Sequence, residues 1–420
     1  MDRLIIEQSP PLRGRVRISG SKNAALPILA ASLMTAETCV LRDMPGLSDI
    51  LVMKSILESL GGETFYDSEN ECMSVNAGKI NEFFADYGMM NRIRASFLIM
   101  GPMLARFGKV RASLPGGCAI GSRPVDLHLK GLAALGADIC LKRGCVEATA
   151  EKLRGTEIHL DFPSVGATAN IVMAAVLTKG RTVIGNCALE PEIGDLCRFL
   201  NVLGADINGI GSDTLVINGV EGLRGGDYRI IPDRIEAGTF MAAACGRPGG
   251  NVVLENVDTS HLRPVIAKLR EMGAIINEEE NGKKLTVSAQ TRLNASDIKT
   301  LPYPGFPTDM QAQFMALLSA STGRGVMTET LFENRFMHAA EMSRMGAQVK
   351  INSRVAIVDG VERLAGCPVR ATDLRAGAAL VVAALGADGI TEILDRFHLE
   401  RGYFRLVEKL RGLGAFVREG

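Results

Sequence analysis

The chain has 420 residues, of which 47% are hydrophobic and 22% charged, a globular composition in a chain too long for one ordinary core. Lysine plus arginine and aspartate plus glutamate both number 47, so the net charge of zero excludes a broad electrostatic surface for nucleic acid or an anionic membrane. Nine cysteines without a C-x-x-C pair, and five histidines without a cluster, predict reduced thiols, a cytoplasmic protein and no metal site.

The beginning of the chain and its longest apolar runs bear on targeting and membrane insertion. Residues 1–7 carry charges where a secretion signal needs an unbroken apolar segment, so we expect no such signal. The runs 166–177 and 376–387 are far shorter than the ~20 residues of a membrane-spanning helix, and they are rich in alanine and glycine. They predict buried helices, and we expect no membrane partner.

One short pattern returns six times: an apolar residue, two others, Leu or Met, a glycine and a small residue. The glycines, spaced by 68 to 75 residues, are Gly61, Gly136, Gly204, Gly273, Gly346 and Gly414. The pattern predicts the last turn of an amphipathic helix that stops at a left-handed glycine. A strand is expected to follow it, as over 138–141, 348–351 and 416–417.

A second helix, rich in small residues, precedes each pattern and leads into a β-branched strand. We predict such helices over 24–34, 168–177 and 375–385, and the strands after them over 38–41, 182–184 and 389–393. Six α/β units of this kind are compatible with a solenoid, a toroidal clamp or two closed domains. The terminal units lack the distinctive polar caps of a solenoid, so we expect an α/β fold of two domains with three pseudo-repeats each.

The loop 222–234 is the predicted crossing between these domains, because Gly225, Gly226 and Pro232 suit a hinge. If strands at 4–7 and 14–19 complete the second domain, the chain crosses twice, near Gly20 and near Pro232. The predicted domains are then 21–232, which carries Cys118, and 1–20 plus 233–420, which carries Asp309.

Chemistry is expected where one unit departs from the common pattern. In the stretch 115–126, two glycines free the backbone, Cys118 follows them, and Arg123 stands among turn-forming residues. The other departures are Lys22 and Arg94 at helix starts, Asp309 after a proline-rich turn, Arg335 within 332–338, and Arg375 and Arg401 in the last unit. Taken singly, these residues equally suit surface turns and salt bridges, and Ser21 and Thr308 suit ordinary helix caps.

The six cations Lys22, Arg94, Arg123, Arg335, Arg375 and Arg401 come from both halves of a neutral chain. Together they suit a substrate with phosphate and carboxylate groups, which arginine binds through two hydrogen bonds at once. A site shared by two domains would also close over its ligand and exclude water. Neither a P-loop nor a dinucleotide-binding glycine motif is present, which argues against ATP and NAD as cofactors, and no cofactor is expected.

Long strings of the sequence resemble the bacterial enolpyruvyl transferases that act on UDP-N-acetylglucosamine. The resemblance runs from end to end through 21–27 (SKNAALP), 115–118 (PGGC), 123–128 (RPVDLH), 164–168 (SVGAT), 306–314 (FPTDMQAQF), 332–338 (FENRFMH) and 373–376 (DLRA). It implies two inside-out α/β barrels joined by a double crossover, which agrees with the repeat count.

The resemblance also implies a reaction and a role for each matching residue. The enolpyruvyl group of phosphoenolpyruvate is expected to pass to the 3′-hydroxyl of the sugar with release of phosphate, in the first committed step of peptidoglycan precursor synthesis. Cys118 is implied as the general acid and the site of a covalent adduct, Asp309 as the base, and Lys22 as a catalytic phosphate ligand. The implied phosphoenolpyruvate contacts are Lys22, Asn23, Arg123, Arg335, Arg375 and Arg401. The implied UDP-N-acetylglucosamine contacts are Asn23, Arg94, Arg123, Pro124, Val125, Asp126, Leu127, Ser164, Val165, Gly166, Asp309 and Leu331.

Two positions depart from this family. Phe162 stands where some relatives carry a lysine, so one diphosphate contact is absent, and Glu400 precedes Arg401 where aspartate is common. We expect the Cys118 thiol to be largely protonated at neutral pH and more reactive to electrophiles without bound phosphoenolpyruvate than with it. The alternatives are the shikimate-pathway enolpyruvyl transferase, which lacks the Pro-Gly-Gly-Cys loop, and a non-catalytic protein that binds the nucleotide sugar. The oligomeric state stays open.

Overall fold

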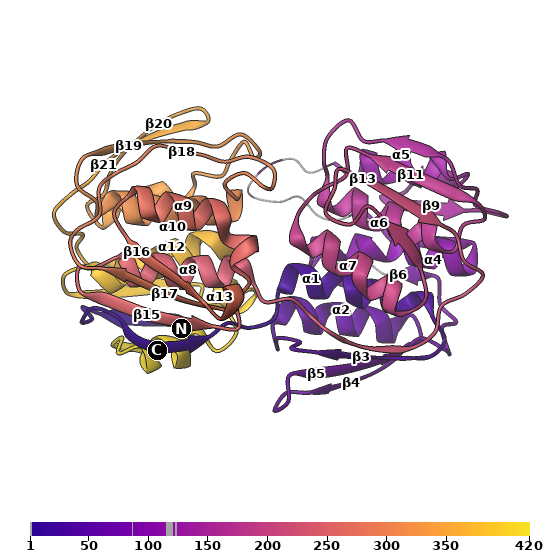
Figure 1. Cartoon of the computed structure of the whole chain (residues 1–420), viewed down its shortest axis with the longest axis horizontal. Helices are drawn as coiled ribbons and strands as arrows, with labels where there is room; N and C mark the ends of the chain where they lie inside the picture. The colour runs from indigo at the N-terminus through magenta and orange to yellow at the C-terminus, as the bar shows by residue number, and fades with distance from the viewer. Residues whose placement is uncertain (1, 86, 115–120, 122–123) are drawn as a thin grey trace. The chain divides into compact units, whose positions relative to one another are not determined.

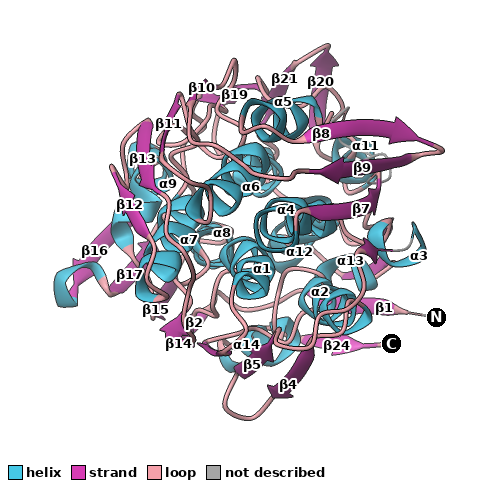
Figure 2. Ribbon diagram, turned by 90° about the vertical axis from the view of Figure 1, so that its right-hand side faces the viewer, coloured by secondary structure: helices cyan, strands magenta, loops and turns pink. Residues whose placement is uncertain are grey.

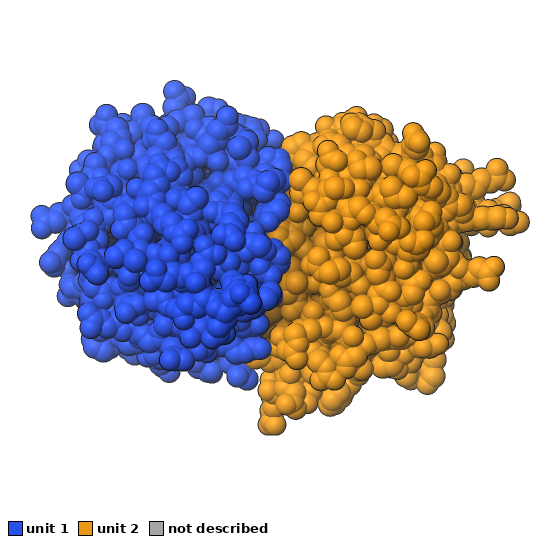
Figure 3. Space-filling model, viewed as in Figure 1, with its two compact units in different colours: residues 1–19, 118–122, 232–420 blue, residues 20–117, 123–231 orange. Residues whose placement is uncertain are grey.

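The computed structural model describes residues 2–85, 87–114, 121 and 124–420. These residues divide into two compact units, coloured separately in Figure 3. Unit 1 comprises 2–19, 121 and 232–420, and unit 2 comprises 20–85, 87–114 and 124–231. Between residues 19 and 20, and again between 231 and 232, the chain passes from one unit to the other.

Unit 1 contains, among its described residues, three four-stranded sheets of one topology (Figure 1). In each sheet one edge strand runs parallel to its neighbour, and the other pairs are antiparallel. In sheet order, the strands are β22 (Pro368–Arg370), β23 (Ile390–Leu394), β1 (Arg3–Glu7) and β24 (Val417–Glu419); β2 (Arg13–Arg17), β15 (Gly250–Glu255), β17 (Lys284–Ala289) and β16 (Ile275–Glu279); β18 (Ile298–Lys299), β19 (Arg324–Thr328), β21 (Val355–Asp359) and β20 (Gln348–Asn352).

Unit 2 repeats the same arrangement in its described residues, again with one parallel and two antiparallel pairs in each of three sheets. The strands are β14 (Gly226–Arg229), β3 (Thr38–Arg42), β5 (Cys72–Asn76) and β4 (Glu63–Asp67); β6 (Phe84–Ala85), β7 (Lys109–Ser113), β9 (Cys145–Thr149) and β8 (Asp138–Lys142); β10 (Glu157–His159), β11 (Arg181–Gly185), β13 (Thr214–Asn218) and β12 (Asp206–Asn208). Six copies of one sheet topology confirm the six repeats expected from the glycine pattern.

The two N-terminal strands belong to unit 1, although they are followed directly by unit 2 in the chain. β1 pairs with β23 and β24, and β2 pairs in parallel with β15. The prediction that strands at 4–7 and 14–19 complete the second group of repeats is therefore confirmed. β1 lies in the interior of its sheet, between β23 and β24, and β2 is the edge strand beside β15.

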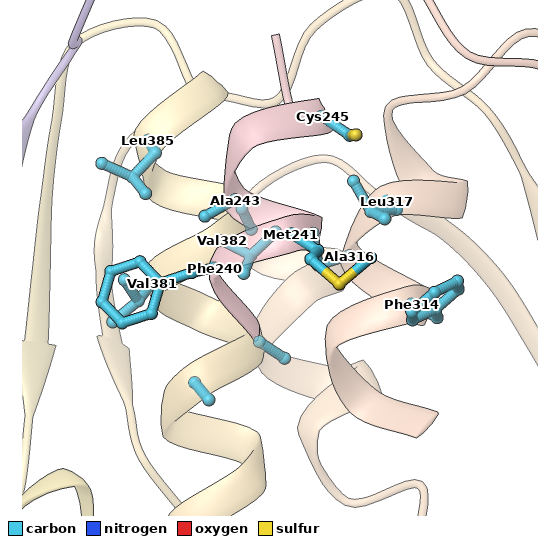
Figure 4. Close-up of a cluster of buried hydrophobic side chains, with 14 of the residues drawn as sticks. Phe240, Met241, Ala243, Cys245, Phe314, Ala316, Leu317, Val381, Val382 and Leu385 are labelled. Atoms are coloured by element: carbon cyan, nitrogen blue, oxygen red, sulfur yellow. The ribbon is translucent and has the colours of Figure 1, made fainter. Parts of the chain in front are cut away.

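Three buried helices form the interior of unit 1: α8 (Arg234–Cys245), α10 (Gln311–Ser319) and α12 (Leu374–Gly386). Figure 4 shows buried side chains from all three, among them Phe240, Phe314 and Leu385. Because apolar side chains surround each helix, the helices lie inside and the sheets outside, the reverse of an ordinary α/β barrel. This is the inside-out α/β fold that we expected.

Unit 2 has a corresponding interior made of α1 (Lys22–Ala31), α4 (Met100–Phe107) and α6 (Val165–Val176), which lie inside the strands in Figure 2. Small residues allow these helices to approach closely. A Cβ atom on Gly101 of α4 would lie 2.3 Å from the backbone oxygen of Asn170 on α6, so only glycine fits there. Predictions of buried helices at 166–177 and 376–387 are confirmed by α6 and α12.

A second set of helices, partly exposed, carries the recurring glycine pattern. These helices are α2 (Ser48–Ser59), α5 (Asp126–Ala134), α7 (Pro191–Val202), α9 (Arg263–Glu271), α11 (His338–Arg344) and α14 (Leu406–Gly412). The six pattern glycines that follow them have φ angles between 90° and 108°, in the left-handed region. The shorter helices are α3 (Tyr87–Met90) and α13 (Phe397–Glu400). In the part of the chain that the structure describes, no helix is long and apolar enough to cross a membrane.

Candidate active site

Asp309 and two arginines form a buried charge cluster in unit 1. Arg335 Nη2 donates to Asp309 Oδ1 at 2.8 Å, and Arg375 Nη2 donates to Oδ2 at 2.9 Å. The arginines are about 5% exposed, whereas the Asp309 side chain keeps 29% of its surface exposed. Burial by itself would raise the pKa of the Asp309 carboxyl, but the charges and hydrogen bonds of Arg375 and Arg335 outweigh it and hold the pKa well below its usual range. One carboxylate between two guanidiniums leaves the cluster with a net positive charge.

Asp309 lies in the 3₁₀ turn η5 (Thr308–Met310), which leads directly into α10. The alternative that Thr308 is an ordinary helix cap is wrong, because no side chain caps this turn. The Thr308 hydroxyl instead donates to Glu329 Oε2 at 2.8 Å. The carboxylate of Asp309 is then free to face the two arginines.

Arg375 is fixed from two directions in the first turn of α12. Asp373 caps the helix by accepting a hydrogen bond from the Arg375 backbone N–H at 2.7 Å. Arg375 Nη1 donates to the hydroxyl of Tyr403 at 3.3 Å, and this hydroxyl also lies 3.0 Å from Thr239 Oγ1 on α8. Tyr403 follows Arg401 by two residues, so its phenol connects the segment that carries Arg401 to Arg375.

Lys22 forms the corresponding buried ion pair in unit 2. Its Nζ donates to Asp49 Oδ2 at 3.0 Å, and both side chains are less than 10% exposed. Ser21 caps α1 by accepting a hydrogen bond from the Ala24 backbone N–H at 3.3 Å, which confirms the expected N-cap. Lys22 is not a solvated surface residue, because Asp49 on α2 holds its ammonium group in the interior.

Most of the described residues that are expected to contact the nucleotide sugar belong to unit 2, whereas Asp309 and Leu331 belong to unit 1. Arg94 begins a 3₁₀ helix, η2 (Arg94–Ile99), and its Nη2 lies 3.5 Å from the backbone oxygen of Pro124. Pro124 and Val125 precede α5, which begins at Asp126 and Leu127. Ser164 caps α6 at its N-terminus, and Val165 and Gly166 form the first turn. Asn23 follows Lys22 on α1.

His128 connects these segments and is a residue that the sequence motifs did not single out. Asn170 Oδ1 accepts from the Gly101 backbone N–H at 2.8 Å, which fixes the amide orientation. Asn170 Nδ2 therefore points to His128 Nδ1, 2.8 Å away, and makes that nitrogen the acceptor. The proton of the neutral ring then lies on Nε2, and a Cβ on Gly166 would lie only 3.0 Å from Nε2. The string RPVDLH was the available signal, because it ends in this histidine.

Several expected site residues fall elsewhere. Cys118 and Arg123 lie outside the described residues, so their placement stays a prediction. Leu331 follows β19, in a loop that Glu329 holds by hydrogen bonds to the backbone N–H groups of residues 331 and 332. Asp49 and Glu329 were missed because neither belongs to a short motif. In the described part of the chain, no group of three or more His, Cys, Asp or Glu side chains is arranged to hold a metal ion.

Comparisons with known proteins agree over almost the whole chain. The model of the family described as EPSP synthase (3-phosphoshikimate 1-carboxyvinyltransferase) matches residues 6–410. UDP-N-acetylglucosamine 1-carboxyvinyltransferase 2 of Carboxydothermus hydrogenoformans is 56% identical over 417 residues, covering 99% of both chains. UDP-N-acetylglucosamine 1-carboxyvinyltransferase 1 of Caldanaerobacter subterraneus subsp. tengcongensis is 54% identical over 415 residues, again covering 99% of both chains.

Solved structures show the same architecture. The enolpyruvyl transferase NikO from Streptomyces tendae matches with a TM-score of 0.90 at 28% identity, covering 100% of this chain and 98% of that chain. An EPSP synthase from Acinetobacter baumannii matches with a TM-score of 0.77 at 19% identity over the full length of both chains. The second likeness speaks for the fold alone.

Proposed function

The chain belongs to the EPSP synthase family of enolpyruvyl (1-carboxyvinyl) transferases, and we propose that it transfers the enolpyruvyl group of phosphoenolpyruvate to the 3′-hydroxyl of UDP-N-acetylglucosamine, releasing phosphate. The observation that carries this assignment is identity above 50% over 99% of the chain to proteins with that activity in their names. The reaction is the first committed step of peptidoglycan precursor synthesis. We place the protein in the cytoplasm, where its small-molecule substrates are found.

The reaction needs an acid, a base and a clamp for anions. C3 of the enol takes up a proton while the sugar oxygen attacks C2, which gives a tetrahedral intermediate that still carries phosphate. Loss of phosphate and of a proton from C3 then restores the double bond. Preorganised cations stabilise the negative charge on the phosphate and carboxylate groups during both steps.

Asp309 is the proposed base for the sugar hydroxyl, and its surroundings explain how that role would be controlled. With Arg335 at 2.8 Å and Arg375 at 2.9 Å, its carboxylate binds a proton poorly. Phosphate or carboxylate groups of phosphoenolpyruvate would compete for the same two guanidiniums. As the arginines turn to the substrate, the pKa of Asp309 rises, so the base becomes effective only when the anion is bound.

Lys22 is the proposed phosphate ligand from unit 2, with Arg123 and Arg401 in the same role. Its ammonium group is paired with Asp49 at 3.0 Å, so it is ordered and its charge is retained although it is buried. The phosphate group of phosphoenolpyruvate would therefore bind a lysine that Asp49 already holds in position. Arg94, Arg335 and Arg375 complete the proposed cation set.

The nucleotide sugar is proposed to bind along the N-terminal ends of α5 and α6, where backbone N–H groups favour phosphate. Pro124 to Leu127 and Ser164 to Gly166 supply these helix starts. Asn23, Arg94, Arg123, Asp309 and Leu331 are the remaining proposed contacts. His128 Nε2 lies beside the start of α6, because a Cβ atom on Gly166 would come within 3.0 Å of it.

Cys118 is the proposed acid that protonates C3 and forms the covalent adduct. A thiol with an ordinary pKa of about 8.5 is mostly protonated at pH 7, so it has a proton to give. Alkylation tests this directly: the rate at Cys118 should fall when phosphoenolpyruvate is added. Equal rates with and without that substrate contradict the proposed contact.

The decisive experiment measures phosphate release from phosphoenolpyruvate with and without UDP-N-acetylglucosamine. We expect release only with both substrates, and a collapse in Cys118→Ala and Asp309→Ala. Shikimate 3-phosphate serves as the alternative acceptor, and release with it in place of the nucleotide sugar would assign the shikimate-pathway reaction. Tight binding of the nucleotide sugar without release would assign a non-catalytic binding protein.

A further inference from the structure

Glu329 is a buried carboxylate that joins two segments of the proposed site. Its side chain is 1% exposed and follows β19 directly. Oε1 accepts from the backbone N–H groups of Leu331 at 2.8 Å and Phe332 at 3.2 Å. Oε2 accepts from the Thr308 hydroxyl at 2.8 Å. The two oxygens therefore hold different parts of the chain.

The loop after β19 is anchored to its sheet independently of this carboxylate. The Glu329 backbone N–H donates to the Arg354 carbonyl at 2.9 Å, and Arg354 Nη1 donates to the Thr330 carbonyl at 2.8 Å. Thr330 bonds to Thr300 twice, through its N–H at 3.0 Å and its hydroxyl at 2.6 Å. The Glu329 carboxylate is thus held in place, and it orients the Thr308 hydroxyl and the backbone N–H groups of residues 331 and 332.

Thr308 is the residue before Asp309, so the Glu329 bond acts on the proposed base. One side of the η5 turn is held by the Thr308–Glu329 bond, and the other by the Asp309–Arg335 ion pair at 2.8 Å. Both partners, Glu329 and Arg335, belong to the segment that also carries Leu331. With two attachments, the turn has little freedom to rotate the Asp309 carboxylate.

We propose that Glu329 is a positioning residue that sets the base Asp309 and the nucleotide-sugar contact Leu331 in register through one buried carboxylate. This inference rests on the proposed function, because it assigns reaction roles to Asp309 and Leu331. The Glu329–Thr308 bond governs the attack step, since a base misplaced by about 1 Å loses rate steeply. The bonds to 331 and 332 govern the binding of the sugar.

The two halves of the proposal are separated by different variants. Thr308→Val removes only the hydroxyl donor, so kcat is expected to fall about tenfold or more, while KM for UDP-N-acetylglucosamine changes less than about twofold. Thr308→Ser keeps the donor and is expected to recover most of kcat. Glu329→Gln keeps an acceptor oxygen for the two backbone N–H groups and an amide N–H that donates to Thr308, so it is expected to be milder than Glu329→Leu, which lowers kcat and raises KM.

A matched control is Thr286→Val in β17, which removes a hydroxyl bond of the same 2.8 Å length to Glu279 elsewhere in unit 1. Melting temperatures of all variants check that the fold is retained. If the wild type is active and Thr308→Val has an unchanged kcat, this inference alone is overturned. The same holds if Thr308→Ser or Thr286→Val loses as much kcat as Thr308→Val. A wild type that releases no phosphate with both substrates overturns the proposed function and the inference together.

Discussion

Two aspartates, one in each unit, differ in the groups that face their carboxylates. Asp309 of unit 1 accepts from two guanidiniums. Asp195 of unit 2, on α7, accepts from the Tyr228 hydroxyl at 2.6 Å and the Ile231 backbone N–H at 3.3 Å, with Arg198 at 3.7 Å. Burial raises the pKa of Asp195 to about 6, whereas the arginines keep the pKa of Asp309 below its usual range.

The comparison shows that charge partners, rather than burial, decide which carboxylate is available for chemistry. Asp309 stays ionised and organises cations. Asp195 is mainly a hydrogen-bonding group that ties α7 to β14 and to Ile231, the last residue of unit 2 before the chain returns to unit 1. Asp309 has a role in the proposed reaction, whereas Asp195 has a structural role in unit 2.

The largest difference is expected in catalysis. Asp309→Asn keeps the shape but removes the base, so kcat for phosphate release should fall roughly 10³-fold, within the range typical of a lost general base. Asp195→Asn should leave kcat at pH 7 within about twofold of the wild type. Comparable losses in both variants would contradict the division of roles.

The pH dependence of stability should have opposite signs at the two sites. Because the pKa of Asp195 is raised, its ionisation destabilises the fold as pH rises from about 4 to about 6, by roughly 3 kcal/mol between an ordinary value of 3.8 and about 6. The melting temperature of Asp195→Asn relative to the wild type should therefore increase over this window and stay level above it.

For Asp309, whose pKa is lowered, the stabilisation is present above the ordinary carboxyl pKa and is lost as pH falls below it. The stability deficit of Asp309→Asn should accordingly shrink toward acidic pH. Thermal unfolding of both variants in one pH series checks the two slopes, and parallel slopes would refute the contrast.

Removing the phenol partner should have a smaller effect. Tyr228→Phe deletes the 2.6 Å hydrogen bond to Asp195, at a cost of about 1 to 2 kcal/mol at neutral pH. It should also move the upper end of the Asp195-dependent pH window above about 6, because this hydrogen bond lowers the pKa of Asp195. An upper end that moves downward would show that the phenol disfavours the ionised carboxylate.

The smallest effect is expected for Arg198→Gln. The arginine side chain is 48% exposed and lies 3.7 Å from Asp195 Oδ1, so solvent screens the pair. We expect the stability at neutral pH to change by less than about 0.5 kcal/mol. A loss of stability as large as that of Tyr228→Phe would show that Arg198 is a charge partner of Asp195. Asp195 would then resemble Asp309, whose carboxylate is stabilised by arginines.

The repeats and much of the fold could be predicted from local patterns in the amino-acid sequence. Left-handed glycines, amphipathic spacing and small-residue helices are local or periodic signals, and they were sufficient to predict six α/β units and buried helices such as α6 and α12. The motifs also named Asp309, Arg335 and Arg375 as candidates, because reactive residues next to turns and helix starts stand out from a repeating scaffold.

Only the tertiary structure decided which partners these residues have. Asp309 meets Arg375 across 66 positions, Lys22 meets Asp49 across 27, and Thr308 meets Glu329 across 21. No local pattern encodes such pairs, because each joins side chains from different elements that the packing of buried helices and sheets brings together. Ionisation depends on the same packing, which is why two arginines hold the pKa of Asp309 below its usual range whereas burial raises the pKa of Asp195.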